Sequence, residues 1–165
     1  MAESVAELIT ALGDNRSALE EFRHLLQEEQ RCIVDLDLDG LSTNGESKEK
    51  ILVQLQTLNG ICQEHLRRAG MELGLAADCS LTPLIARAAP TVRDTLLKLQ
   101  NSIFDVAGSV SRLNSVNREL LQNSLSMTGR SMEFFLKLLH STDTYGASGQ
   151  MAEGTAQVRI LCQEI

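Results

Sequence analysis

The chain has 165 residues and a formal net charge of -7, with 43% hydrophobic residues but only 3% aromatic ones, no tryptophan and two prolines. This composition argues against a sandwich or barrel and favours an all-α fold built on packed Leu, Ile, Val and Ala. The negative charge argues against nucleic acid or an anionic membrane surface as the main partner. A chain of this length supports one domain at most.

The start of the chain does not read as a targeting signal. The segment MAESVAELITAL contains two acidic residues and no Lys or Arg, so it lacks the basic region of a signal peptide. No apolar run approaches the length that spans a bilayer, so we expect no direct membrane insertion. We therefore expect a cytoplasmic protein.

The residues that could catalyse a reaction or bind a metal are scattered along the chain. They are Cys32, Cys62, Cys79 and Cys162, and His24, His65 and His140. No C-x-x-C pair and no metal-ligand spacing occurs, so we expect reduced cysteines that fill buried or half-buried positions. The sequence predicts no catalytic residue, no metal site, no cofactor and no enzymatic activity.

The first predicted helix runs from about residue 5 to residue 36. Its apolar residues recur at every third or fourth position, which is typical of a helix packed in a bundle. These residues are Val5, Leu8, Leu12, Leu19, Phe22, Leu26, Ile33 and Leu36. Asn15 and Glu29 interrupt this seam, and Gly13 costs about 1 kcal/mol relative to Ala. We predict one helix with a weak point near residues 13–15, with a kink or break there as the alternative.

An acidic segment, DLDLDGLSTNGE, occupies residues 35–46. It matches the spacing of a calcium-binding EF-hand loop, in which oxygen ligands alternate along the chain. The matching residues are Asp35, Asp37, Asp39, Gly40 and Glu46. Ser42 stands where such loops carry an aliphatic residue, no second loop exists, and Leu36 continues the preceding seam. We interpret the segment as a helix-to-helix turn with solvated carboxylates.

The second helix is predicted to begin after the acidic segment. Asn44 or Ser47 is its expected N-cap. Its apolar stripe extends to Leu73 and is wide enough to contact more than one neighbour. Gly74 and the small residues that follow it are expected to end the helix.

A short helix and the longest helix complete the pattern. Thr82 as N-cap and Pro83 as first residue predict a short helix through Ala89. From Thr91 to Ser141 a heptad seam predicts one helix about 75 Å long. We therefore expect an elongated, partly antiparallel bundle or coiled coil of three long helices and one short helix, with residues 1–141 as a single helical domain.

The far half of the longest helix carries a second apolar row. The row consists of Leu121, Leu125, Met132, Phe135 and Leu139, beside the seam residues Phe134 and Leu138. Burying one such side chain is worth roughly 1.5 to 3 kcal/mol. If the first two helices cover one row, something else is needed to cover the other, either a partner protein or a homodimer or intrachain core. Gly129 weakens this half, so we expect local disorder there without a partner.

After Ser141 the helical pattern stops. Residues 142–165 contain three glycines and few large apolar residues until Val158. We predict a flexible C-terminal tail. Tyr145, the only tyrosine, follows the helix end, where an aromatic side chain can anchor a partner.

Taken together, these segments resemble the FlgN-type flagellar export chaperones. The resemblance covers about residues 19–149 and rests on LEEFRHLLQEEQRCIVDLDLDGL with KEKILVQL, and on LNSVNRELLQNSLSMTGRSMEFFLKLL followed by TYGASG. The more specific features are the N-x-x-L-L-x-x-S-L run from Asn117 to Leu125 and the Tyr-Gly pair after the last helix.

The resemblance implies a small acidic cytosolic chaperone without catalytic activity. Such chaperones bind C-terminal helical segments of hook-filament junction proteins of the FlgK and FlgL type, prevent their premature assembly, and deliver them to the cytosolic domain of the type III export gate. In the family the C-terminal half of the last helix binds the substrate, which assigns partner binding to the second row with Phe134 and Leu138. The tyrosine of the tail motif is implicated in gate docking, and Tyr145 matches it by position.

Two other classes of protein stay open as alternatives. A calcium-responsive helical interaction protein would use the carboxylates of residues 35–46. A purely structural coiled-coil oligomer would show a mass that depends on concentration. For the chaperone, the expected mechanism is the capture of an amphipathic helix in a groove, coupled to ordering of the last turns.

Overall fold

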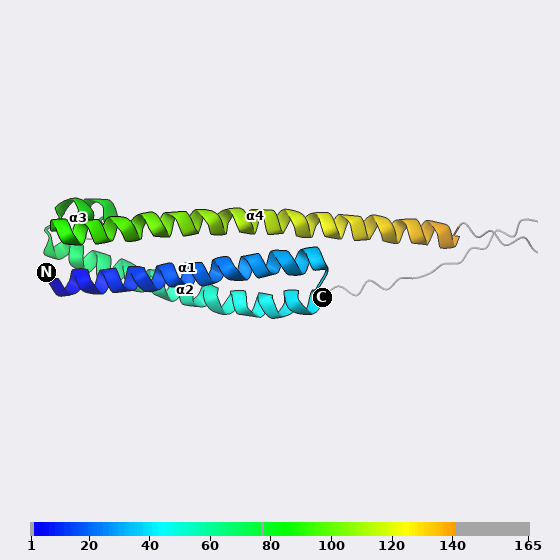
Figure 1. The fold of residues 1–165 in the computed structure, drawn as a ribbon, viewed down its shortest axis with the longest axis horizontal. Coiled ribbons are helices and arrows are strands. Elements are labelled where there is room, and N and C mark those ends of the chain that lie inside the picture. The colour runs from blue at the N-terminus through cyan, green and yellow to red at the C-terminus, as the bar shows by residue number, and fades with distance from the viewer. Residues whose placement is uncertain (1, 77, 141–165) are drawn as a thin grey trace, which may run out of the picture. The chain divides into compact units, whose positions relative to one another are not determined.

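The computed structural model describes residues 2–76 and 78–140. Over these ranges the chain forms four helices and no strand (Figure 1). The helices are α1 (Ala2–Asp35), α2 (Leu38–Glu72), α3 (Leu81–Arg87) and α4 (Pro90–His140). This confirms the predicted all-α fold of three long helices and one short one.

The chain divides into two compact units, residues 1–121 and residues 122–165, and α4 contributes to both. The prediction that residues 1–141 form one domain stays a prediction. The first unit contains α1, α2, α3 and the first part of α4. The second unit is described below together with the candidate site.

Helix α1 runs without interruption through the predicted weak point. Gly13 lies within the helix, and the hydroxyl of Ser17 donates a hydrogen bond to the Gly13 carbonyl at 3.0 Å. The alternative of a break near residues 13–15 is therefore wrong. The helix tolerates this glycine because Ala11 and Ala18, on either side of it, are buried.

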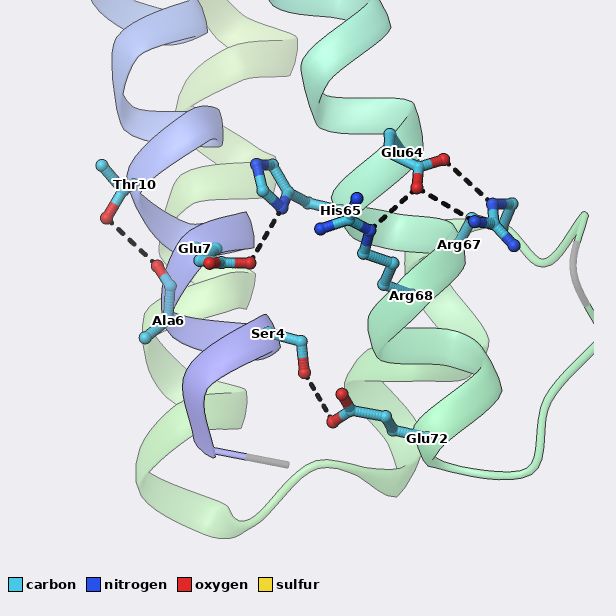
Figure 2. Close-up of polar contacts among 9 residues, drawn as sticks. All are labelled: Ser4, Ala6, Glu7, Thr10, Glu64, His65, Arg67, Arg68 and Glu72. Carbon is cyan, nitrogen blue, oxygen red and sulfur yellow. Dashed lines mark hydrogen bonds and ion pairs between the residues drawn. The ribbon is translucent and has the colours of Figure 1, made fainter.

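Helices α1 and α2 are antiparallel partners in the first unit. Near the start of α1, the Ser4 hydroxyl donates a hydrogen bond to the Glu72 carboxylate at 2.5 Å, and His65 Nδ1 lies 3.2 Å from Glu7 Oε2 (Figure 2). Near the end of α1, Glu29 pairs with Lys48. The sequence numbers rise along one helix as they fall along the other, as they must in a hairpin of two helices.

The main apolar core lies where the start of α1 meets the end of α2, α3 and the start of α4. Its buried members are Val5, Leu8, Ala69, Leu84, Ile85, Ala88 and Leu96. Because Leu8 shares this core with Leu96, while Leu26 farther along α1 accepts a hydrogen bond from Asn117, α4 runs parallel to α1. The predicted seams of α1 and α4 thus face each other in the first unit.

Helix α3 begins and ends two residues earlier than predicted. Its N-cap is Ser80, which makes no side-chain capping bond, and its last residue is Arg87. Thr82 and Pro83 therefore lie inside the first turn. A proline is tolerated there because the backbone N–H groups of the first turn have no partner within the helix. Burial of Leu84 and Ile85, rather than a cap, holds this short helix in place.

The turn between α1 and α2 is much shorter than the predicted acidic turn. Only two residues, Leu36 and Asp37, separate the helices. Asp37 is the N-cap of α2, and its carboxylate accepts a hydrogen bond from the Gly40 backbone N–H at 2.9 Å. The predicted start of α2 after Asn44 is wrong, because an aspartate seven residues earlier caps the helix first.

Leu36 ends α1 in a backbone conformation that glycine usually adopts. Its φ is +58°, the Leu36 N–H donates to the Ile33 carbonyl at 3.4 Å, and the Asp37 N–H donates to the Cys32 carbonyl at 2.9 Å. These two bonds form a Schellman motif with Leu36 at the left-handed position. The prediction that Leu36 continues the buried seam is wrong, since its side chain is exposed.

Helix α2 ends where the sequence predicted, and it ends in the same motif. Gly74 has a φ of +69°, its N–H donates to the Met71 carbonyl at 3.0 Å, and the Leu75 N–H donates to the Gly70 carbonyl at 2.9 Å. Glycine adopts this conformation without a steric penalty, whereas leucine does not.

Candidate functional site

The predicted partner-binding residues all lie in α4, and most belong to the second unit. Leu125, Met132, Phe134 and Phe135 are exposed over 60% to 72% of their surface. Leu138 and Leu139 are also exposed, whereas Leu121, the last residue of the first unit, is half-buried.

The apolar seam of α4 is buried or half-buried in the first unit and exposed in the second. In the first unit every large seam residue is buried or half-buried, and these residues are Val92, Leu96, Leu99, Ile103, Val106, Val110, Leu113 and Leu120. In the second unit the seam residues Met127, Phe134 and Leu138 are exposed, as is the row beside them. The described part of the second unit therefore presents two adjacent apolar rows to solvent. Met127 and Leu136 belong to this surface, although they are not among the binding residues predicted from the sequence.

Within this surface the two phenylalanines contact each other. The Phe134 and Phe135 ring centroids lie 6.0 Å apart with an interplanar angle of 66°. An edge-to-face pair of this kind is a large apolar contact area with few rotatable bonds. Aromatic side chains with these properties are typical anchors in protein interfaces.

A buried polar layer crosses the first unit one helical turn before Leu121. Asn117 is 1% exposed, and its Nδ2 donates to the Leu26 carbonyl at 2.7 Å and to Glu29 Oε2 at 2.9 Å. Lys48 of α2 donates to the other Glu29 oxygen. In the sequence Glu29 is only an interruption of the α1 seam, although its charge in that position predicts a buried pairing partner.

Asn44 makes a matching contact on the α2 side of the same layer. Its Nδ2 donates to the Leu25 carbonyl at 2.9 Å, and its side chain is buried. The residue expected to cap α2 therefore binds the backbone of α1 instead. This layer joins α1, α2 and α4 at a fixed register just before α4 enters the second unit.

The calcium-loop residues are divided between two helices, with Asp35 as the last residue of α1, Asp37 as the N-cap of α2, and the others within α2. Asp39 lies in the first turn of α2, Gly40 follows it, and Glu46 lies farther along the helix. Glycine at residue 40 is explained by packing and not by calcium binding. A Cβ at this position would lie 2.8 Å from Cys32 Sγ and would also meet the Asp37 carboxylate. Among the described residues, no group of three or more His, Cys, Asp and Glu side chains could hold a metal ion.

Among the described residues, the titratable group with the largest pKa shift, Glu64, lies on the exposed face of α2. Hydrogen bonds from Arg67 and Arg68 lower the pKa of Glu64 to about 2 (Figure 2). Both arginines lie on the same helix, three and four residues farther on, so the cluster is a local surface network. Burial raises the pKa of the Cys62 thiol, and the negative charge of Asp14 adds to this effect.

The remaining predicted site residue, Tyr145, and the predicted tail, residues 142–165, lie outside the described residues. Cys32, Cys62 and Cys79 are free, buried or half-buried thiols, as predicted. Within the described ranges, no helix is long and apolar enough to span a membrane.

Comparison with known protein families gives a match over most of the chain. The model of the FlgN family, described as "FlgN protein", matches residues 1–153. The chain belongs to the FlgN family. Searches of curated proteins and of solved structures find no match.

Membership in the FlgN family confirms the resemblance seen in the sequence. It implies a flagellar assembly chaperone, and the FlgN family is not a family of enzymes. The match includes all of α4 and extends past Tyr145. The exposed apolar surface of α4 therefore belongs to the FlgN part of the chain.

Proposed function

We propose that this FlgN protein is a cytosolic type III export chaperone that binds C-terminal helical segments of flagellar hook-filament junction proteins. It would prevent their premature assembly and deliver them to the cytosolic domain of the export gate. The observation that carries the proposal is the exposure of Leu125, Met132, Phe134 and Phe135 on the second unit. Exposed apolar side chains gathered on one segment are typical of a protein interaction surface.

The spacing of these side chains suits a helical partner. Leu125, Met132 and Phe135 follow one another at seven and three residues, so they lie along one face of α4. Phe134 lies on the adjacent face and follows Met127 by seven residues. A second amphipathic helix that packs against α4 here would cover both rows.

The charge pattern of this segment is consistent with an apolar contact. Between Gln122 and Leu139 only Arg130, Glu133 and Lys137 are charged. Removal of the apolar side chains from water supplies most of the free energy of such an association. The expected ordering of the last turns is not needed for this, because α4 is already helical to His140 without a partner. Ordering of the partner helix opposes the association, which keeps the net affinity low enough for release at the gate.

The test measures binding of the intact chain to a peptide that corresponds to the C-terminal helical segment of a junction protein. The triple variant Leu125→Ala, Met132→Ala and Phe135→Ala is expected to weaken binding at least about 100-fold by calorimetry, since each truncation of an interface anchor costs about 1 kcal/mol or more. Alanine keeps the helix propensity of α4, so circular dichroism should show unchanged helix content.

Phe104 provides a matched control. It lies on α4 in the first unit and is 68% exposed, so Phe104→Ala removes a comparable side chain from outside the proposed surface. We expect this variant to bind the peptide as the parent chain does. Equal affinity of the triple variant and the parent chain would contradict the proposed site. A parent chain that self-associates through this surface and ignores the peptide would instead support a structural oligomer.

A further inference from the structure

The turn between α1 and α2 presents a second apolar surface, distant in sequence from the proposed chaperone site. We define the hairpin tip as residues 34–39. Its three apolar side chains, Val34, Leu36 and Leu38, are exposed over 67%, 74% and 75% of their surfaces. The seam residue just before them, Ile33, is 4% exposed, so burial in α1 stops abruptly at the hairpin tip.

Leu36 does not stabilise the fold at the position it occupies. Its φ of +58° lies in the left-handed region, where a leucine side chain clashes with its own backbone. The equivalent position at the end of α2 is Gly74, and both helices end in the same Schellman motif. A side chain that strains the backbone and is mostly exposed is expected to have a use outside the fold.

Carboxylates alternate with these apolar side chains. Asp35 and Asp39 are exposed, and neither carboxylate makes an ion pair or hydrogen bond within the described part of the chain. The third, Asp37, is engaged as the N-cap of α2. The nearest arginine in sequence, Arg31, pairs with Glu28 at 2.9 Å, so it does not neutralise the hairpin tip.

We propose that the hairpin tip is a docking surface for a protein segment that presents Lys or Arg side chains beside apolar ones, such as one face of a basic amphipathic helix. The apolar side chains would supply contact area, and the two unpaired aspartates would select the positive charge. The same charges repel nucleic acid and anionic lipid, which leaves a basic protein segment as the occupant. This surface shares no residue with the apolar rows of α4, so its test does not depend on the proposed function.

The probe is a short amphipathic helical peptide made of Leu and Lys, and its counterpart has Glu in place of Lys. Calorimetry at physiological ionic strength measures affinity, and amide NMR shifts locate the site. We expect the Lys peptide to bind with amide shifts at residues 34–39 and the Glu peptide not to bind at these residues. In the variant Leu36→Gly with Leu38→Ser, affinity for the Lys peptide at this site should fall about tenfold or more.

Leu36→Gly alone separates binding from folding. Glycine relieves the backbone strain, so this variant should be at least as stable as the parent chain and yet bind the Lys peptide more weakly. A loss of binding by this variant therefore cannot come from unfolding. Unchanged affinity in both Leu36 variants would overturn the apolar part of the proposal.

Charge-matched variants test the carboxylates. Asp35→Asn with Asp39→Asn should weaken binding of the Lys peptide several-fold and reduce its salt dependence. Glu21→Gln with Glu49→Gln removes the same charge from exposed positions elsewhere on α1 and α2 and should have little effect. Equal effects of the two pairs would overturn the proposal, because the attraction would then follow the net charge alone.

Two other outcomes would overturn the proposed occupant. Binding of anionic vesicles at the hairpin tip would assign the surface to a membrane. Loss of self-association in Leu36→Gly would assign it to a second copy of the chain.

Discussion

Asn117 of α4 and Glu29 of α1 are joined by a buried hydrogen bond of 2.9 Å, although 88 residues separate them in the chain. The same amide nitrogen also donates to the Leu26 carbonyl at 2.7 Å. Lys48 of α2 pairs with the same Glu29 carboxylate. A buried carboxylate with two different donors is satisfied only in one alignment of the three helices, so the layer fixes the register of α4 against the hairpin.

Removing the Asn117 amide should destabilise the first unit. Asn117→Ala leaves Glu29 buried with Lys48 as its remaining described partner, and a hydrogen bond to a charged group contributes about 1.5 to 3 kcal/mol. The buried Asn117 Oδ1 has no hydrogen-bond partner among the described residues, and its removal offsets part of this loss. We expect a decrease of about 1.5 kcal/mol in the free energy of unfolding, measured by urea denaturation. Asn114→Ala, at an exposed position on the same helix, should change it by less than about 0.5 kcal/mol.

Leu36 and Gly74 allow a reciprocal test of backbone strain. Leu36→Gly should raise the free energy of unfolding by about 1 kcal/mol, because it removes a left-handed leucine and no buried contact. Gly74→Ala should lower it by about 1 kcal/mol, since it places a Cβ on a left-handed residue with otherwise open space around it. Thermal denaturation followed by circular dichroism measures both changes. If both substitutions shifted the midpoint in the same direction, the assigned strain at Leu36 would be wrong.

Gly40 should be required for the short turn. In Gly40→Ala the new methyl group meets the Asp37 carboxylate and Cys32 Sγ, so the capping bond to the residue 40 N–H must lengthen or break. Loss of an N-cap costs about 1 kcal/mol. Gly45→Ala is the matched control, because nothing lies within 4 Å of a Cβ at that position and alanine favours the helix. We expect urea denaturation to show a loss of stability for the first variant and no loss for the second.

Glu64 gives a specific pH dependence. Its pKa in the folded chain is about 2, below the ordinary value of 4.5, because Arg67 and Arg68 donate hydrogen bonds to the carboxylate. The ionised form is therefore favoured by folding, so its contribution to stability is complete above pH 4.5 and is lost as the pH falls from 4.5 to about 2. The pair is exposed, so the contribution is small. A carboxyl-carbon NMR titration should place the midpoint near 2, and Arg67→Gln with Arg68→Gln should move it towards 4.5. A midpoint near 4.5 in the parent chain would show that the arginines do not hold this carboxylate in solution.

Tyr145 should separate substrate binding from gate docking. Under the proposed function, Tyr145→Ala leaves affinity for the junction-protein peptide unchanged, because the peptide binds the apolar rows of α4. The same variant should lose binding to the purified cytosolic domain of the export gate, measured by calorimetry, whereas Tyr145→Phe retains the ring. Loss of peptide binding in Tyr145→Ala would place the tyrosine in the substrate site instead.

The sequence predicted the helices well where apolar periodicity is continuous. The seams from Val5 to Ile33 and from Val92 to Leu120 are buried or half-buried at nearly every apolar position. The bounds of α4 differ from the prediction by about one residue at each end. Periodicity is a local property of the chain, so it identifies the buried face of a long helix without knowledge of what covers it.

The helix ends were predicted less well because several residues compete for the same role. Asp37, Asn44 and Ser47 are all good N-caps by type. The structure uses Asp37 as the cap, and it places Asn44 against the Leu25 carbonyl of α1. That choice depends on the neighbouring helix, which a local pattern does not include.

The sequence by itself determined the fold class, the long helices and the family of this FlgN protein, because repeated apolar spacing and short local motifs specify them. Only the tertiary structure decided that Leu36 leaves the seam at the hairpin tip and that Glu29 is buried against Asn117 and Lys48. It also distinguished the buried part of the α4 seam from the exposed part. The reason is that burial depends on where other helices end, and residues far apart in the chain set those positions.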